Sequence, residues 1–239
     1  MIIQMIKNIL FLLFSALVFS QEDGSAFDFL YPSENLIIKY HDDWGKGNYK
    51  KIIQEFKKDP LKYNEIVFLG NSITAEGKNW SERLNYPNIK NRGIGGDVTD
   101  GVLSRIMEII YFKPKAVFLL IGINDIWNND SPNIPSPQYI GNNIIKITQA
   151  IGWSSPDTKI YVQTILPIEK KKFKKSIVEV NKIIKSNDEE FEVIDLYSVF
   201  VNENGLMTKE LTTDGIHLNE KGYKKWVDFI KPIIYSINN

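Results

Sequence analysis

Ala116-Val-Phe-Leu-Leu-Ile121 is an unbroken apolar run, and Gly122 follows it directly. A short apolar run rich in strand-forming residues and closed by a glycine is typical of a strand buried on both faces of a sheet. Four other runs have a similar length and composition, the second being more polar: Glu65–Gly70, Ile89–Ile94, Lys159–Ile165 and Glu192–Tyr197. The sequence therefore predicts five short strands.

Amphipathic helices are predicted between these strands, because apolar residues recur there at spacings of three and four. We expect these helices near residues 80–84, 99–111, 140–151, 177–184 and 223–233, with a further helix at 49–56 before the first strand. Strands that alternate with helices predict an α/β fold, in which helices cover both faces of a parallel sheet. Right-handed crossovers make all strands of such a sheet point the same way.

Composition narrows the possible chemistry. The 239 residues include no cysteine and only two histidines, His41 and His217, and the formal net charge is +0. A thiol nucleophile and a cysteine–zinc site are therefore excluded, and two histidines leave little for a histidine-rich metal site. The lack of net charge gives no general reason to expect a nucleic acid or an anionic membrane as partner.

The N-terminal stretch has the layout of a secretory signal peptide. Lys7 precedes the apolar run Ile9–Phe19, and polar residues follow Ser20. The run is too short to cross a bilayer comfortably, so we expect residues 1–20 to be cleaved off between Ser20 and Gln21. No cysteine is available there for lipid attachment. The mature protein is then expected to be secreted or periplasmic, without stable membrane insertion.

The mature chain, residues 21–239, has the length of one α/β domain, and we expect 27–60 to be an N-terminal extension packed on it. His41 lies in this extension, beside two aspartates. It is a weaker candidate for a catalytic base than His217, since no nucleophile motif lies near it. We expect His41 to be structural or exposed.

Small and polar residues follow the predicted strands closely. Ser72 comes after the first strand, Gly96 after the second, Asn124 after the third, and Asp214 and His217 in the loops after the fifth. Ligands bind outside the carboxyl ends of the strands in such sheets. These residues are therefore expected to meet at one edge of the sheet.

Ser72 and His217 could act as nucleophile and base. A serine hydroxyl is a weak nucleophile until a base takes its proton, and His217 is the candidate base at that edge of the sheet. Asp214, three residues earlier, could bond to the ring and fix its tautomer. The structural alternatives are a simple turn at Ser72 and a turn at 214–217 that leads into a helix capped by Asn219.

Gly96 and Asn124 could bind an oxyanion. The Gly96 N–H would be open to a developing negative charge, and the Asn124 amide could donate to the same oxygen. The alternatives are again structural, since glycine permits a positive φ and asparagine often forms a turn or a cap. Asp97 is expected to begin a helix.

Four segments combine these residues in chain order: Phe68-Leu-Gly-Asn-Ser72-Ile-Thr, Asn91-Arg-Gly-Ile-Gly-Gly96-Asp, Gly122-Ile-Asn124-Asp125 and Asp214-Gly-Ile-His217-Leu-Asn. They resemble the four blocks of the SGNH hydrolases, also called the GDSL esterase/lipase superfamily. Asn71 stands where the family pattern has aspartate, and this change leaves the other site residues in place.

The resemblance implies a three-layer α/β/α sandwich with a five-stranded, flavodoxin-like parallel sheet, and metal-independent hydrolysis of carboxylic esters. By their place in the blocks, Ser72 would be the nucleophile, His217 the general base and Asp214 its orienting partner. The oxyanion hole would consist of the Ser72 and Gly96 backbone N–H groups and the Asn124 side chain. No cofactor is implied.

The expected substrate is a small-molecule or glycan ester, above all an O-acetyl group on a sugar or polysaccharide, because compact secreted members resemble carbohydrate acetylesterases. Trp127 could stack on a sugar ring or be a buried aromatic. The lysine run at 170–175 could attract an acidic polysaccharide or be a solvated basic face. The alternatives are a lipid or thioester hydrolase (lysophospholipase or platelet-activating-factor acetylhydrolase-like) and a non-catalytic carbohydrate-binding protein.

Overall fold

A single sheet forms the centre of the structure, a computed structural model that describes residues 27–127, 135–187 and 190–237. The predicted signal peptide and its cleavage site lie outside these residues. The strands are β1 (Ile66–Gly70), β2 (Ile89–Gly93), β3 (Ala116–Leu120), β4 (Lys159–Gln163) and β5 (Glu192–Ile194). They stand in the order β2-β1-β3-β4-β5, and every neighbouring pair is parallel. This is the flavodoxin-like order, so the predicted five-stranded parallel sheet is confirmed.

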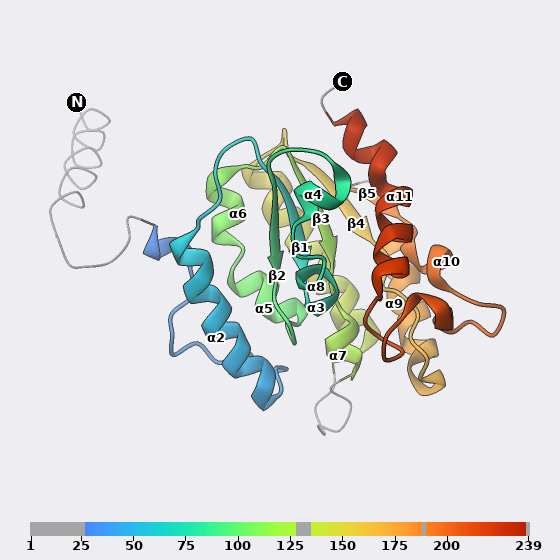
Figure 1. The fold of residues 1–239 in the computed structure, drawn as a ribbon. Coiled ribbons are helices and arrows are strands. Elements are labelled where there is room, and N and C mark those ends of the chain that lie inside the picture. Colours follow the sequence, from blue (N-terminus) through green and yellow to red (C-terminus); the bar gives the residue numbers. More distant parts are fainter. Residues whose placement is uncertain (1–26, 128–134, 188–189, 238–239) are drawn as a thin grey trace, which may run out of the picture.

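Helices cover both faces of this sheet (Figure 1). On one face α11 (Glu220–Ser236) contacts α4 (Trp80–Leu84) and α10 (Leu196–Phe200). On the other, α8 (Pro137–Ser154) contacts α5 (Thr99–Ser104), α6 (Met107–Phe112) and α9 (Lys174–Lys185). The short helices are α3 (Ser72–Ala75), α7 (Ile123–Trp127), η1 (Asp28–Leu30), η2 (Lys171–Phe173) and η3 (Lys209–Leu211). The predicted three-layer α/β/α sandwich is therefore confirmed.

The single helix predicted at residues 99–111 is wrong, because the chain breaks into α5 and α6 at Arg105. Arg105 leaves helical geometry (φ −113°, ψ 19°), and its buried guanidinium points to the carboxyl ends of β1 and β2. It donates to the Asp97 carboxylate and to the backbone oxygens of Gly70 and Arg92. A buried charge without such partners would cost several kcal/mol, which exceeds the gain from a continuous helix.

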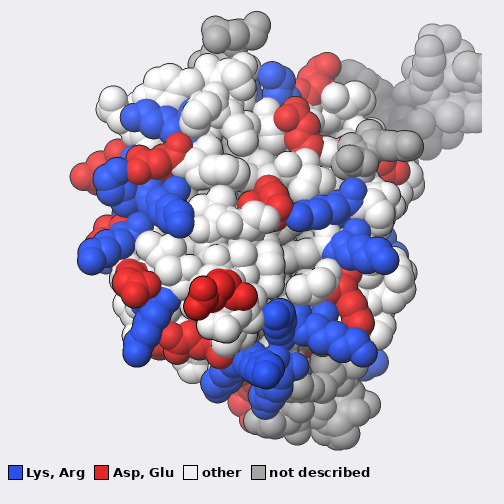
Figure 2. All heavy atoms as spheres, turned by 90° about the vertical axis from the view of Figure 1, so that its right-hand side faces the viewer, with Lys and Arg blue, Asp and Glu red and all other residues white. Residues whose placement is uncertain are grey.

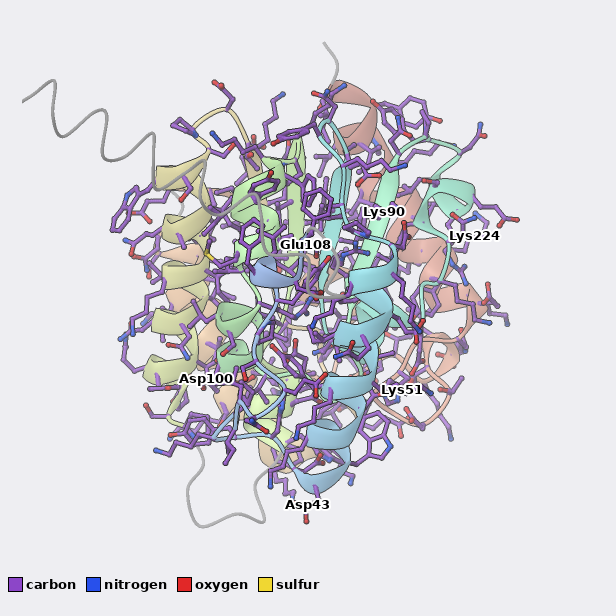
Figure 3. The ribbon with its side chains drawn as sticks, turned by 90° about the vertical axis from the view of Figure 1, so that its left-hand side faces the viewer. Asp43, Lys51, Lys90, Asp100, Glu108 and Lys224 are labelled. Carbon is purple, nitrogen blue, oxygen red and sulfur yellow. The ribbon has the colours of Figure 1, made fainter. Side chains whose placement is uncertain are left out.

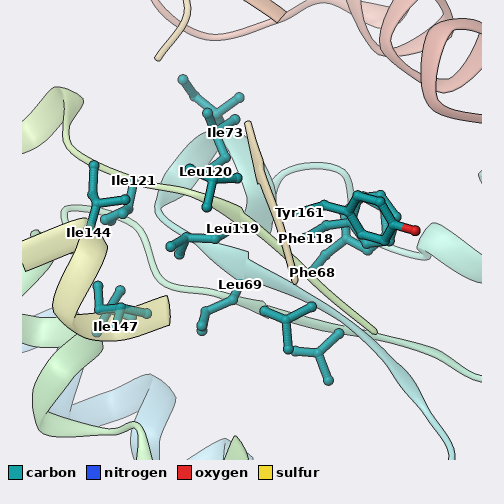
Figure 4. Close-up of a cluster of buried hydrophobic side chains, with 14 of the residues drawn as sticks. Phe68, Leu69, Ile73, Phe118, Leu119, Leu120, Ile121, Ile144, Ile147 and Tyr161 are labelled. Atoms are coloured by element: carbon teal, nitrogen blue, oxygen red, sulfur yellow. The ribbon is translucent and has the colours of Figure 1, made fainter. Parts of the chain in front are cut away.

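Aromatic rings form a stacked row across the middle of the sheet (Figure 4). Phe118 of β3 lies between Phe68 of β1 and Tyr161 of β4, with ring centroids 5.0 and 4.6 Å apart. Trp80 stacks on Phe68 at 4.3 Å, and Trp226 of α11 meets Trp80 edge-on at 4.7 Å. All five rings are buried, so they fix the central strands against α4 and α11.

The N-terminal extension is more helical than predicted, since α2 spans Asp43–Lys58 rather than 49–56. Asp42 caps this helix by accepting from the Gly45 N–H at 2.6 Å. The helix runs beside the edge strand β2 and begins at the edge of the sheet where the strands end (Figures 1 and 3). Within the described ranges, neither α2 nor any other helix is long and apolar enough to cross a membrane.

The carboxylate of Glu108, which is part of a buried ion pair, holds the N-terminal extension against the sheet. Glu108 of α6 pairs with Arg92 of β2 at 2.9 Å (Figure 3). The same carboxylate accepts from the Tyr31 hydroxyl at 2.8 Å and from the Leu61 N–H at 2.9 Å. Both ends of the extension are thereby held by one buried carboxylate.

Candidate active site

Ser72 stands where β1 turns into α3. Asn71 is the N-cap of this helix, and Ser72 is its first residue. The Asn71 side-chain oxygen accepts from the Ile73 N–H at 3.1 Å in an environment that leaves Asn71 only 1% exposed. An aspartate could make the same cap, but it would bury a charge. The departure from the family pattern at Asn71 therefore preserves the turn that presents Ser72.

The turns after β1 and β2 lie side by side. The Ile94 N–H donates to the Gly70 oxygen at 3.0 Å, and Arg105 donates to the same oxygen at 3.1 Å. Gly70 cannot carry a side chain, because a Cβ would collide with the Leu120 oxygen and with Thr74 Oγ1. The bond from Ile94 to Gly70 places the Ser72 turn next to the turn that contains Gly96.

Ser72, His217 and Asp214 form one continuous chain of hydrogen bonds. Ser72 Oγ lies 3.0 Å from His217 Nε2, and His217 Nδ1 lies 2.7 Å from Asp214 Oδ2. With the Nδ1 proton donated to the carboxylate, Nε2 is left as an acceptor for the serine hydroxyl. The structure thus brings Ser72 together with an Asp214–His217 pair, although Ser72 and His217 are 145 positions apart in the sequence.

Backbone bonds shape the turn that carries Asp214 and His217. Gly215 adopts a positive φ of +87°, and its oxygen accepts from the Glu169 N–H at 2.9 Å. Thr212 Oγ1 donates to the His217 oxygen at 2.6 Å. Asn219 caps α11 by accepting from the Gly222 N–H at 3.0 Å. The Asn219 cap expected in the structural alternative is therefore present, and the turn before it directs the His217 imidazole at Ser72.

The Asp214 carboxyl favours its ionised form. Partial burial raises its pKa, but hydrogen bonds from the His217 ring, the His217 N–H and the Ile216 N–H outweigh this and hold the pKa below its usual value. An ionised Asp214 is the form that can accept the Nδ1 proton bond and stabilise an imidazolium.

Glu76 is a neighbour of this chain that the sequence analysis did not single out. Its carboxylate Oε1 lies 3.8 Å from His217 Nε2, and its side chain is 49% exposed. Glu76 follows Ser72 by four residues, which is one helical turn, and the Glu76 N–H donates to the Ser72 oxygen at 2.8 Å. That spacing is the signal that could have found it.

Gly96 and Asn124 lie on the neighbouring turns. Gly96 has a positive φ of +79°, so its glycine is required by the backbone as well as by any role in binding. Asn124 is the second residue of α7, and its amide donates one hydrogen bond, at 2.9 Å, to the oxygen of Asp97. An amide nitrogen has two hydrogens, so one remains to donate to a ligand.

Asp97 anchors the turn that contains Gly96. Its carboxylate accepts from the Val98 N–H and from His41 Nε2, both at 3.0 Å, and pairs with Arg105 at 2.8 Å. Asp97 lies two residues before the first residue of α5, whose N-cap is Val98, and His41 is buried, which agrees with the structural one of its two expected roles. The residue that follows Gly96 is therefore held in place by hydrogen bonds to its carboxylate from His41, Val98 and Arg105.

Asp125, the last residue of its block, is a buried acid. It accepts from the Thr99 hydroxyl at 2.6 Å and from the Thr99 N–H at 3.1 Å, which caps the start of α5. Complete burial raises the pKa of Asp125 to about 7, although the bonds from Thr99 oppose the rise. Asp125 therefore links α7 to α5 behind Asn124.

Trp127 and the lysine run lie at one end of this edge. The Trp127 ring is partly buried against Phe173 at 5.2 Å, and the Lys170 ammonium lies 3.9 Å from the ring centroid. Lys174 donates to the Asn204 oxygen at 2.9 Å. Figure 2 shows the right-hand side of Figure 1, and basic side chains gather at the lower end of that face. Part of the run is therefore used in internal contacts.

In the part of the chain that the structure describes, no three His, Cys, Asp or Glu side chains gather in a way that could hold a metal ion.

Known proteins resemble this chain over most of its length. Residues 68–225 match the model of the GDSL-like lipase/acylhydrolase family. The platelet-activating factor acetylhydrolase IB subunit alpha2 of Homo sapiens is 26% identical over 198 residues, which cover 79% of this chain and 82% of that protein.

Two solved structures extend the comparison. A protein from Streptococcus pneumonia, assigned as a platelet activating factor, superposes with a TM-score of 0.66 at 26% identity, over 81% of this chain and 95% of that one. A carbohydrate esterase family 3 protein from Talaromyces cellulolyticus superposes with a TM-score of 0.55 at 20% identity, over 74% of this chain and 99% of that one. The second likeness concerns the fold alone.

Proposed function

The chain belongs to the GDSL-like lipase/acylhydrolase family and is a carboxylic ester hydrolase, and we propose that it removes short acyl groups through an acyl-enzyme on Ser72. The observation that carries this proposal is the unbroken chain of hydrogen bonds Asp214–His217–Ser72 at the carboxyl edge of the sheet. Gly96 and Asn124 stand on the adjoining turns and supply donors for the negative oxygen.

In the proposed reaction, Ser72 Oγ attacks the carbonyl carbon of the ester while its proton passes to His217 Nε2. Asp214 stabilises the resulting imidazolium. The oxyanion accepts hydrogen bonds from the Ser72 and Gly96 N–H groups and from the second hydrogen of the Asn124 amide. His217 then protonates the departing alcohol, and a water molecule attacks the acyl-enzyme with His217 again as base.

The preferred substrate in this proposal is an O-acetyl group on a sugar or polysaccharide. Release of acetyl is supported by the human relative, which is named an acetylhydrolase. A carbohydrate esterase shares the fold. A lipid ester is the second candidate, and the observation that favours it is the same human relative, which is named for platelet-activating factor.

Acetate release from a panel of acetylated glycans, beside a series of p-nitrophenyl esters from acetyl to octanoyl, separates these candidates. The proposal expects acetate from at least one glycan and the highest kcat/KM on the acetyl ester. Activity that rises towards octanoyl would favour the lipid substrate instead.

Ser72→Ala tests the nucleophile. We expect kcat to fall on the order of 10⁶-fold, as it does when the serine of a comparable hydrolase is removed. A fluorophosphonate should phosphonylate Ser72 with loss of hydrogen fluoride, so the wild-type protein should gain the mass of the phosphonyl group and the variant should not. A Ser72→Ala protein that hydrolyses p-nitrophenyl acetate near the wild-type rate would contradict the assignment, and an unlabelled, inactive wild type would favour the non-catalytic carbohydrate-binding alternative.

Export is also proposed, on the pattern of residues 1–20. Expression of the full chain in a bacterial host should yield an exported protein whose N-terminus is Gln21. An N-terminus at Met1 would contradict it.

A further inference from the structure

The first turn of α2 lies directly against the turn that contains Gly96. Asn48 donates its side-chain amide to the Gly95 oxygen at 2.9 Å. The indole of Trp44 lies beside both glycines, since a Cβ added at Gly96 would be 2.9 Å from Trp44 Cζ3 and one at Gly95 would be 2.9 Å from Trp44 Cη2. A side chain at residue 95 or 96 would therefore come closer to the indole than an ordinary van der Waals contact allows.

Trp44 is nevertheless 64% exposed. A tryptophan normally buries most of its surface, as Trp80 and Trp226 do in this protein at 0% exposure. One edge of the Trp44 ring rests on the backbone of Gly96, and the remainder faces solvent. An apolar, flat and rigid surface is thus open at the rim of the proposed oxyanion site.

The backbone that carries the indole is held in place by its neighbours. Asp42 caps α2 two residues before Trp44, and the buried bond between His41 and Asp97 fixes the segment just before that cap. The first residue of α2, Asp43, lies at the edge of the sheet where the strands end (Figure 3). Exposure therefore does not come from a loose segment, and such a rigid exposed aromatic is the kind that anchors ligands.

Trp127, which the sequence offered for this role, is less available. Phe173 and the Lys170 ammonium both lie against its ring. The two tryptophans differ in this respect, although both stand near the ends of the strands.

We propose that Trp44 forms the subsite for the alcohol part of the ester, by stacking on the sugar ring that carries the acetyl group; this inference rests on the proposed function. An acetyl group is too small to need a surface of this size. An open aromatic face suits a sugar within a longer chain, because the chain must continue into solvent on both sides of the ring.

The test compares one leaving alcohol with a sugar ring and one without. Trp44→Ala and Trp44→Phe are assayed for acetate release from an acetylated xylo-oligosaccharide and from ethyl acetate. Stacking predicts that Trp44→Ala lowers the ratio of kcat/KM on the oligosaccharide to that on ethyl acetate about five- to tenfold, mainly through KM, and that Trp44→Phe restores most of it. Trp153→Ala is the matched control, because Trp153 is 79% exposed and lies at the far end of α8.

An equal loss on both substrates would overturn the inference, since it would mean that the indole only supports the Gly96 backbone. An unchanged ratio would overturn it as well, while leaving the proposed deacetylation of glycans intact. If the wild-type protein hydrolyses ethyl acetate but no acetylated glycan, the sugar substrate and this subsite are both wrong, and the esterase mechanism stands.

Discussion

At the scale of single residues, the proposed oxyanion hole depends on the second hydrogen of the Asn124 side-chain amide. Asn124 already gives one of its amide hydrogens to the Asp97 oxygen, so a single hydrogen remains for the substrate. Asn124→Ala should therefore lower kcat roughly 10²- to 10³-fold with the fold retained. The measurement is kcat on p-nitrophenyl acetate beside a thermal melt. An activity loss below about threefold would show that Asn124 only braces the turn at Asp97.

The residues of the chain Asp214–His217–Ser72 were predictable from the sequence, because each belongs to a block with a fixed place after a strand. Trp44 was not predictable, and Glu76 could have been found only from its spacing of four residues after Ser72. Glu76 required knowledge that α3 continues for one turn beyond Ser72. Trp44 lies far from the blocks along the chain, and only the packing of α2 on the Gly95–Gly96 turn places it there. A residue that reaches the site only through tertiary packing cannot be found from a local sequence motif.

At the scale of elements, strands were easier to predict than helices. Buried strands of a parallel sheet are continuous apolar runs, and the five predicted runs all contain a strand. The apolar spacing at 99–111 predicted one continuous helix. It could not show that the chain breaks at Arg105, whose side chain turns inward to pair with Asp97. The first turns of α2 were not predicted, because Gly45 and Gly47 have a low helix propensity. The cap at Asp42 stabilises these turns in the structure.

The anchor of the N-terminal extension gives a stability prediction. Glu108→Gln leaves Arg92 as an uncompensated buried charge and weakens the bonds to Tyr31 and Leu61. We expect the free energy of unfolding to fall by about 3–5 kcal/mol in urea denaturation. The control is Glu55→Gln, which removes an exposed ion pair with Lys58 and should cost under about 1 kcal/mol. Equal losses in the two variants would contradict the role of the anchor.

The contact between α7 and α5 gives a pH prediction. Since burial raises the pKa of Asp125 to about 7, the folded protein holds this proton more tightly than the unfolded chain does. The stabilisation is full below the ordinary pKa of an aspartate and is lost as the pH rises through 7. Relative to Asp125→Asn, the wild-type free energy of unfolding should fall by a few kcal/mol between pH 4 and pH 8. A difference between the two proteins that does not vary with pH would refute this.

At the scale of the whole molecule, the order β2-β1-β3-β4-β5 determines where the site can be. The strands are all parallel, but successive strands are added on opposite sides of β1, so the strand order switches between β1 and β3. The turns after those two strands carry Ser72 and Asn124. The parallel sheet was predictable from the alternating strands and helices, whereas its flavodoxin-like arrangement was expected only from the family resemblance. The contact of the extension with the Gly96 turn was not predictable, because His41 and Asp97 are 56 positions apart.

The five tryptophans include both buried and exposed residues, so the intrinsic fluorescence of the protein can report on the core and on the surface separately. Trp80 and Trp226 lie in the aromatic row at 0% exposure, whereas Trp44 and Trp153 are 64% and 79% exposed. Acrylamide should quench the red-shifted emission of the exposed pair first and leave a blue-shifted component from the row. A glycan seated on Trp44 should shield part of the quenchable signal while the blue component stays constant. One fluorescence titration can therefore distinguish occupancy of the rim from a disturbance of the core.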